Sequence, residues 1–148
     1  MSKIKTNERE LASNVAHWFN EHIERNDFPF TSATNETGIA TGETTRFGDI
    51  VIWRDRNAGS AYSYIELKPP TGSKENLETF RQKAIALNVT YAYTWNFQSL
   101  NVYKVEKGKI TLLDSHSTPI FLSIEESKQG DKQAIIRTHI MRICADLV

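Results

Sequence analysis

Three segments of the chain carry apolar residues at every third or fourth position, and this period predicts amphipathic helices. The helices are expected over residues 7–25, 73–88 and 131–148. Asn7 and Ser73 stand where polar residues cap the first two of them. The predicted apolar face of the first helix consists of Leu11, Val15, Trp18, Phe19 and Ile23.

Short apolar runs between the helices predict β-strands. Asn57 and Gly59 turn the chain back after the first run, and Pro69 stops the second. A threonine-rich stretch over residues 31–46 has no helical period and is expected to form a strand-and-loop excursion. The strands are expected at residues 49–53, 62–68, 89–95, 100–105 and 110–114.

The order of these elements predicts the fold class. A helix, a set of strands, a second helix and further strands indicate an α/β (α+β) fold, in which helices flank a mixed central sheet. The helix at 73–88 joins two strands, and such a crossover predicts a parallel, right-handed connection. A length of 148 residues without an internal repeat predicts a single domain, 1–148.

Composition restricts the location and the partners of the protein. No apolar run approaches the roughly 18 residues that span a membrane, and the first ten residues are too polar for a secretory signal. The single cysteine, Cys144, excludes an internal disulfide framework, so a cytoplasmic protein is expected. Because 18 basic residues balance 18 acidic ones, the chain is not expected to bind nucleic acid strongly by itself. Target recognition is expected in a partner or in a larger polypeptide of which this is the N-terminal domain.

Charged residues stand at the ends of two predicted neighbouring strands. Asp49 begins the first apolar strand, and Glu66 and Lys68 end the second. Residues two apart in a strand share a face, so Glu66 and Lys68 point the same way. Carboxylates held close together shift their pKa values or recruit a cation, which predicts a metal site. The alternative is a solvated salt bridge between Glu66 and Lys68 at a strand end.

The motifs FGDIVIW (residues 47–53), YIELKPP (64–70) and YAYTWN (91–96) resemble the PD-(D/E)xK nuclease superfamily. The likeness is greatest to the nuclease domains of restriction enzymes that are fused to helicase or methyltransferase domains. It covers roughly residues 7–105 and implies an α-β-β-β-α-β core. Gly48 stands where many members carry a proline. Gln82 matches a glutamine of the helix that follows the motif, but Ala86 replaces the tyrosine that often accompanies it.

The resemblance implies a Mg²⁺ site, in which Mn²⁺ can substitute. Asp49 and Glu66 would supply carboxylate ligands, and the carbonyl of Leu67 a further one. Lys68 would hold the attacking water and stabilise developing negative charge. Gln82 is implied as a further residue of the catalytic site.

A further acid on the first helix is also implied by the resemblance. Glu8 lies in the middle of the predicted apolar face, whereas Glu10 points nearly opposite at 100° per residue. A carboxylate on an inward face needs a reason to be there, so Glu8 is the candidate. The alternative is that Glu8 is a first-turn acid that interacts favourably with the helix dipole.

The expected activity is Mg²⁺-dependent DNA endonuclease cleavage, in a restriction–modification enzyme or a similar defence or repair machine. One site cuts one strand, so double-strand cleavage would need a homodimer or another second copy. A non-catalytic module that binds nucleic acid or a partner is the alternative from another class. An RNA-directed nuclease is less favoured, because no aromatic stacking motif for RNA is visible.

Several other side chains are weaker candidates. Tyr62 and Tyr64 are expected on the face of Glu66, where they would line the cleft or pack as half-buried sheet residues. The four histidines lack zinc-ligand spacing with Cys144 and are expected to be structural or exposed. A set of cationic residues flanks the motifs and would contact phosphates or form a solvated surface. These residues are Arg46, Lys74, Arg81 and Lys83.

Overall fold

The structure, a computed structural model, describes residues 2–36, 48–68, 77–117 and 129–147. Side chains are described for residues 10–35, 50–68, 77–117 and 129–147.

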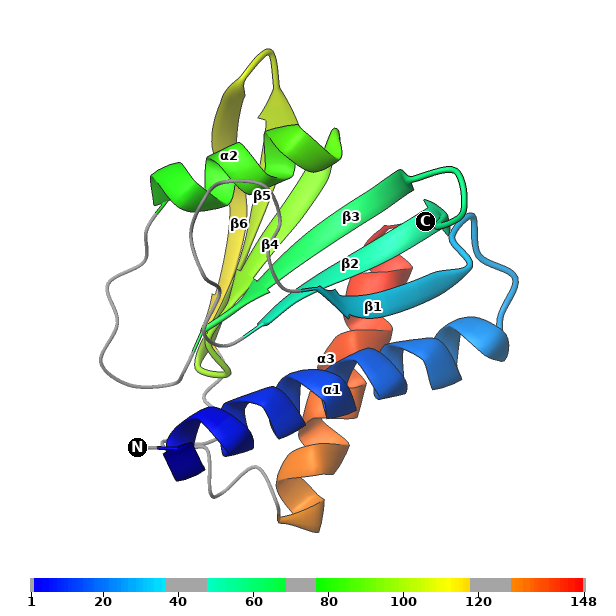
Figure 1. The fold of residues 1–148 in the computed structure, drawn as a ribbon, viewed down its shortest axis with the longest axis vertical. Coiled ribbons are helices and arrows are strands. Elements are labelled where there is room, and N and C mark those ends of the chain that lie inside the picture. The colour runs from blue at the N-terminus through cyan, green and yellow to red at the C-terminus, as the bar shows by residue number, and fades with distance from the viewer. Residues whose placement is uncertain (1, 37–47, 69–76, 118–128, 148) are drawn as a thin grey trace.

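Six strands form one mixed sheet in which the spatial order follows the chain order, β1-β2-β3-β4-β5-β6 (Figure 1). All neighbours are antiparallel except β3 and β4, which run parallel as the intervening helix predicted. The strands are β1 (Ser32–Glu36), β2 (Gly48–Asp55), β3 (Ser60–Leu67), β4 (Tyr91–Trp95), β5 (Ser99–Glu106) and β6 (Lys109–Ser117).

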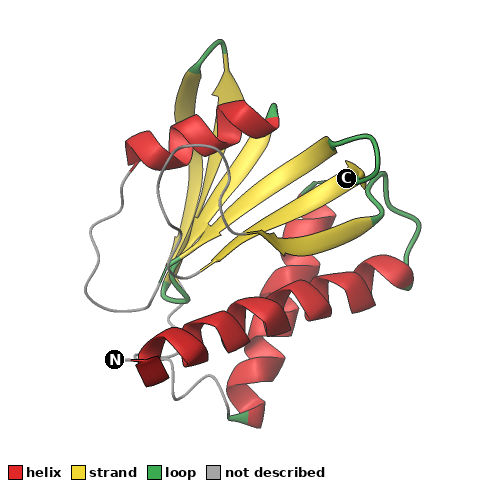
Figure 2. Cartoon of the chain, in the orientation of Figure 1, coloured by secondary structure: helices red, strands yellow, loops and turns green. Residues whose placement is uncertain are grey.

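The helices are α1 (Ser2–Glu24), α2 (Leu77–Leu87) and α3 (Gly130–Asp146). Helix α2 covers one face of the sheet, and α1 and α3 lie together on the other (Figures 1 and 2). The predicted α+β fold with a mixed sheet flanked by helices is therefore confirmed. None of the described helices is long and apolar enough to cross a lipid bilayer.

Helix α1 begins earlier than predicted, at Ser2 instead of residue 7. Glu8 consequently lies in the second turn of this helix and not in its first. The alternative explanation of Glu8 as an acid at the positive end of the helix dipole loses force, because that effect falls off within the first turn. All five apolar residues predicted to face inward from this helix are buried.

Two apolar cores lie on opposite faces of the sheet. The larger one packs α1 and α3 against β2, β3 and β4, with Phe19, Ile65 and Ile140 among its members. The smaller one packs α2 against the other face, where the ring of Phe80 lies 5.6 Å from that of Tyr64 and 5.1 Å from that of Tyr103. Because β3 contributes to both cores, its side chains alternate between two buried environments.

A β-bulge in β3 changes the expected position of Tyr62. Ile52 pairs with Ser63, but Trp53 pairs with Ala61, so Tyr62 is an extra residue on this strand. Its ring packs on the core of α1 and α3, and its hydroxyl donates a 2.6 Å hydrogen bond to the carbonyl of Leu147. The prediction that Tyr62 shares a face with Glu66 was therefore wrong, because simple alternation ignores the bulge.

Candidate functional site at the ends of strands β2 and β3

The register of β2 and β3 places Asp49 directly opposite Glu66. Directly opposed residues of an antiparallel pair present their Cβ atoms on the same face of the sheet, typically about 5 Å apart. On this face β3 also carries Tyr64, which packs under α2. The two acids that the sequence singled out, 17 positions apart, thus meet at one point of the sheet below the crossover helix. The side chain of Asp49 is outside the described part of the structure.

The carboxylate of Glu66 is buried and surrounded by polar groups of β3 and α2. Its side chain is 3% exposed. Oε1 accepts a 3.2 Å hydrogen bond from the hydroxyl of Tyr64 and lies 3.4 Å from Nζ of Lys83. Oε2 lies 3.7 Å from Nζ of Lys68. Burial of a carboxylate is tolerated when it is paired and hydrogen-bonded, and two ammonium groups and a phenol provide this here.

Lys68 reaches Glu66 from the solvent side. It follows the last residue of β3, and its backbone N–H donates a 2.9 Å hydrogen bond to the carbonyl of Trp95, which keeps the chain in line beyond the strand. Its side chain is 28% exposed. A partly exposed ammonium beside a buried carboxylate can contact both that carboxylate and a group arriving from solvent.

Lys83 is the residue of this site that sequence reasoning missed. It was expected to contact phosphates or to lie in solvent, yet its side chain is 4% exposed and paired with Glu66. Its position in the sequence could have indicated its burial. Lys83 follows Phe80 by three residues and directly precedes Ala84, so it lies on the buried face of α2. A lysine on such a stripe needs a buried anion as its partner.

Gln82, one residue earlier, is turned about 100° away from Lys83 around α2. It is exposed, and its amide donates a 3.2 Å hydrogen bond to Glu78 on the same helix. In this structure α2 therefore brings Lys83, and not Gln82, to Glu66. The side chain of Leu67 is buried in the opposite core, which leaves only its backbone carbonyl to act as a ligand near Glu66.

The remaining candidates fall partly outside the described residues. Glu8 lies in α1, but its side chain is not among those described, and Arg46 and Lys74 lie outside the described ranges altogether. Arg81 is on the surface, where it pairs with Glu78 and donates a 2.7 Å hydrogen bond to the carbonyl of Gly108. This ion pair lowers the pKa of Glu78 and raises that of Arg81.

A row of polar residues crosses the sheet through Glu66. Thr94 pairs with Glu66 in the parallel register, Asn101 pairs with Thr94, and Ser115 pairs with Asn101. The Asn101 amide donates a 3.2 Å hydrogen bond to the Thr94 hydroxyl, and the Ser115 hydroxyl donates a 2.6 Å bond to Asn101. With Glu36 opposite Asp49 on β1, every strand contributes one polar residue to this row.

The described side chains alone contain no group of three or more histidine, cysteine, aspartate or glutamate residues that could hold a metal ion. Asp49 and Glu8, the other two acids expected in the metal site, are not among these side chains. The donor set indicated by the register is therefore two carboxylates, those of Asp49 and Glu66. Carboxylate oxygens are the ligands preferred by Mg²⁺, which binds through one or two of them together with water.

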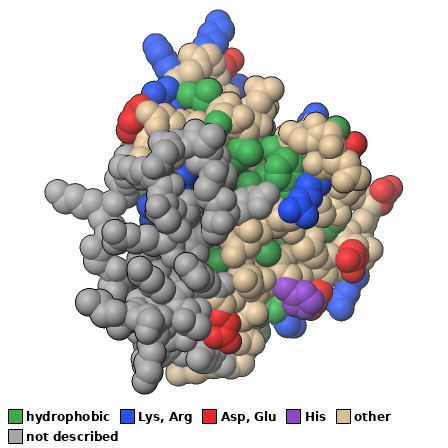
Figure 3. Space-filling view, viewed as in Figure 1, with side chains coloured by type: hydrophobic (Ala, Val, Ile, Leu, Met, Phe, Trp, Pro, Cys, Tyr) green, Lys and Arg blue, Asp and Glu red, His purple; other side chains and the backbone are tan. Residues whose placement is uncertain are grey.

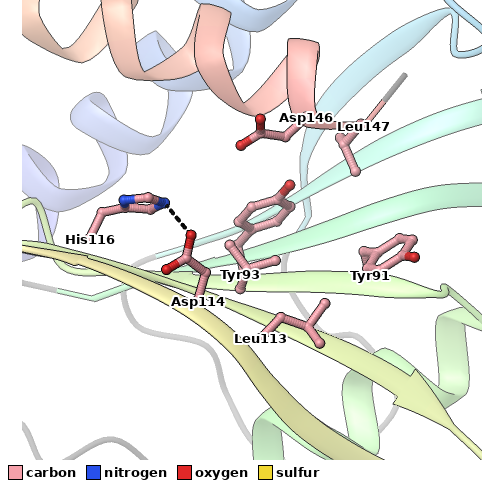
Figure 4. Close-up of a pocket in the computed structure, with 8 residues that line it drawn as sticks. Tyr91, Tyr93, Leu113, Asp114, His116, Asp146 and Leu147 are labelled. Carbon is pink, nitrogen blue, oxygen red and sulfur yellow. Dashed lines mark ion pairs between the residues drawn. The ribbon is translucent and has the colours of Figure 1, made fainter.

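A separate cavity of about 580 Å³ opens between the end of α3 and strands β4, β5 and β6 (Figure 4). Two of its lining residues, His116 and Asp114, pair at 3.0 Å. The guanidinium of Arg142 lies 3.3 Å from the same imidazole. Tyr93 lines this cavity, whereas its neighbour Thr94 belongs to the polar row on the other face of the sheet. The cavity is therefore distinct from the site at Glu66.

Comparison with known proteins identified no relative of the chain. No protein-family model, no curated protein and no solved structure is significantly similar to the chain.

Proposed function

We propose that the chain is a Mg²⁺-dependent DNA endonuclease domain that hydrolyses phosphodiester bonds, with its site at the ends of β2 and β3. The observation that carries this proposal is the direct pairing of Asp49 with Glu66, with Lys68 on the same carboxylate. The register between Asp49 and Glu66, which are 17 positions apart, and the contact of Lys68 with Glu66 support the proposal. The likeness of the surrounding motifs to PD-(D/E)xK nucleases supports the same reading.

Each residue has a role that follows from its position. Asp49 and Glu66 would hold the metal ion, and the resemblance to PD-(D/E)xK nucleases adds the Leu67 carbonyl and Glu8 as further ligands. A Mg²⁺ ion bound there supplies charge to polarise the phosphodiester and lowers the pKa of a bound water. Lys68, at the solvent side of Glu66, would orient the attacking water and stabilise negative charge that develops on the phosphate oxygens. Gln82 faces solvent and bonds Glu78, so we assign it no part in holding the metal ion.

The charge distribution does not favour strong DNA binding by this chain alone. On the face in Figure 3, the cationic side chains of the described residues are interspersed with acidic ones and form no continuous basic stripe. The whole chain has no net charge. Affinity for DNA depends largely on neutralising phosphates. We therefore assign target recognition to a second copy, or to a helicase, methyltransferase or recognition domain that works with this one.

One observation favours a second candidate, a non-catalytic module of the same fold. Glu66 is already in contact with the ammonium groups of Lys68 and Lys83, which neutralise it without a metal ion. In such a module the charged cluster would serve stability or partner binding alone.

Cleavage of supercoiled plasmid by the chain, with Mg²⁺, with Mn²⁺ or with EDTA, separates the two candidates. Metal-dependent nicking that disappears in Asp49→Ala and Glu66→Gln, and persists in Glu106→Gln, would support the nuclease. Glu106 is a suitable control because it is an exposed glutamate that also pairs with a lysine, Lys104. If the wild-type chain does not cleave DNA and calorimetry detects no Mg²⁺ binding to it, the non-catalytic module is favoured.

A further inference from the structure

We propose that Lys83 is a resident counter-cation of Glu66, whose ammonium group gives way when a divalent cation binds. This inference rests on the proposed metal site at Asp49 and Glu66 and adds a regulatory element to it. Lys83 would hold the site in a neutral, folded state before metal arrives and would compete with the metal for the same carboxylate.

Burial is the first support for this assignment. The side chains of Lys83 and Glu66 are 4% and 3% exposed, so each is the buried counter-charge of the other. Lysine is almost never fully buried unless it is paired. Removal of one member of a buried pair leaves an uncompensated charge, which is strongly destabilising. A cation is therefore required at Glu66 at all times, whether it is an ammonium group or a metal ion.

The geometry of the contact is the second support. Nζ of Lys83 lies 3.4 Å from Oε1, whereas charge-assisted N–H···O bonds are typically about 2.7–2.9 Å long. Lys68 approaches the other oxygen at 3.7 Å. Both ammonium groups thus neutralise Glu66 from a distance longer than the optimum for a direct bond. Such contacts can be exchanged for shorter ones to a metal ion.

The charge balance is the third support. Asp49 and Glu66 carry two negative charges, and Lys68 and Lys83 carry two positive ones, so the four groups together are neutral. A divalent cation added to this set would create an excess charge of +2 unless an ammonium group withdraws or an anion enters. Lys83 is carried by α2, which lies over this face of the sheet, and its flexible four-carbon stem allows the ammonium group to move away from Glu66.

Two measurements on purified protein test this assignment: calorimetric titration with Mg²⁺, and the melting temperature with and without Mg²⁺. The variants are Lys83→Met, which keeps an unbranched side chain without the charge, and Lys83→Gln as a polar second variant in case the first does not fold. Lys104→Met is the matched control, because Lys104 also pairs with a glutamate but is exposed.

Without metal, the Lys83 variants should melt at a lower temperature than the wild type. They should bind Mg²⁺ more tightly, by about tenfold or more, because a like charge beside the metal has been removed. Saturating Mg²⁺ should then raise their melting temperature by more than it raises that of the wild type or of Lys104→Met.

The outcomes separate this inference from the proposed function. Wild-type binding that is lost in Glu66→Gln, together with Lys83 variants that bind Mg²⁺ no more tightly than the wild type, would overturn the role of Lys83 and leave the metal site standing. If neither the wild type nor the Lys83 variants bind Mg²⁺, or if Glu66→Gln binds it as the wild type does, both proposals fail. Tighter binding in the Lys83 variants that again requires Glu66 supports both.

Discussion

The side chain of Asn20 in α1 exchanges two hydrogen bonds with the backbone of Ala33 in β1. The amide nitrogen donates a 2.7 Å bond to the Ala33 carbonyl, and the Ala33 N–H donates a 2.8 Å bond to the amide oxygen. Strand β1 is an edge of the sheet, and edge strands present unpaired backbone groups that can pair with other chains. Asn20 therefore provides hydrogen-bond partners for the backbone N–H and carbonyl of Ala33, as a neighbouring strand would. The same two bonds join α1 to the sheet.

Replacement of Asn20 by alanine should destabilise the fold by about 2 kcal/mol, because it leaves a part-buried donor and acceptor of the backbone without partners. The free energy of unfolding in urea measures this effect. Asn26→Ala is the control, since the Asn26 amide bonds an exposed carbonyl at the end of the same helix. Equal stability of the two variants would show that the edge of β1 does not depend on Asn20.

Replacement of Tyr62 by phenylalanine should lower the free energy of unfolding by about 1 kcal/mol, which is typical of one lost hydrogen bond. The hydroxyl group is the link between the bulge of β3 and the carbonyl of Leu147, beyond the end of α3. The ring, which packs 5.1 Å from that of Phe30, is retained in this variant. Tyr91→Phe removes the hydroxyl from an exposed tyrosine and should have little effect in the same urea titration.

The stability of the protein should fall as the pH drops below 6.5, and His139 should contribute to this fall. Partial burial, followed by the electrostatic effects of Arg142 and His116, holds the pKa of His139 below 6.5, its ordinary value. The unfolded chain therefore binds the proton more readily, so the stability is complete above this pH and is lost as protons bind below it. Unfolding in urea at several pH values should show a smaller loss for His139→Asn. The fall should persist in His17→Gln, which alters an exposed histidine. An identical pH dependence in wild type and His139→Asn would contradict this assignment.

The thiol of Cys144 should resist modification in the folded protein. The residue is fully buried in the core of α1 and α3, and burial raises the pKa of its thiol to about 12. Because the thiolate is the reactive species, a disulfide reagent at neutral pH should label the thiol only after unfolding in denaturant. The absorbance of the released thiol reports this directly. Rapid stoichiometric labelling of the native protein would show that the C-terminal helix opens readily.

Elements of the fold followed from the sequence where the signal was local. The periods of the apolar residues predicted three helices and five strands, the threonine-rich stretch at 31–46 predicted a further strand-and-loop segment, and the crossover helix predicted the one parallel pair. The motif residues Asp49 and Glu66 could be expected to approach each other, because both lie at strand ends and the strands are consecutive. The register then pairs them directly.

Other features of the site depend on pairing between distant segments. Lys83 looked like a surface residue because lysine is usually solvated, and only the position of Glu66 under α2 explains its burial. The displacement of Tyr62 depends on a bulge that alternation does not encode. Thr94, Asn101 and Ser115 form a row only through the register of three strands, which the pattern of any one strand does not fix.

This row of polar residues also bears on how faithfully the chain folds. A slip of one residue between two strands exchanges the faces of all their side chains. At β4 such a slip would move Thr94 into the larger core and turn Tyr93 or Trp95 toward the polar site, so misaligned sheets lose both packing and hydrogen bonds. The residues aligned with Glu66 thus favour the native register over misaligned ones. The alignment that completes the sheet therefore also brings the residues of the polar site together.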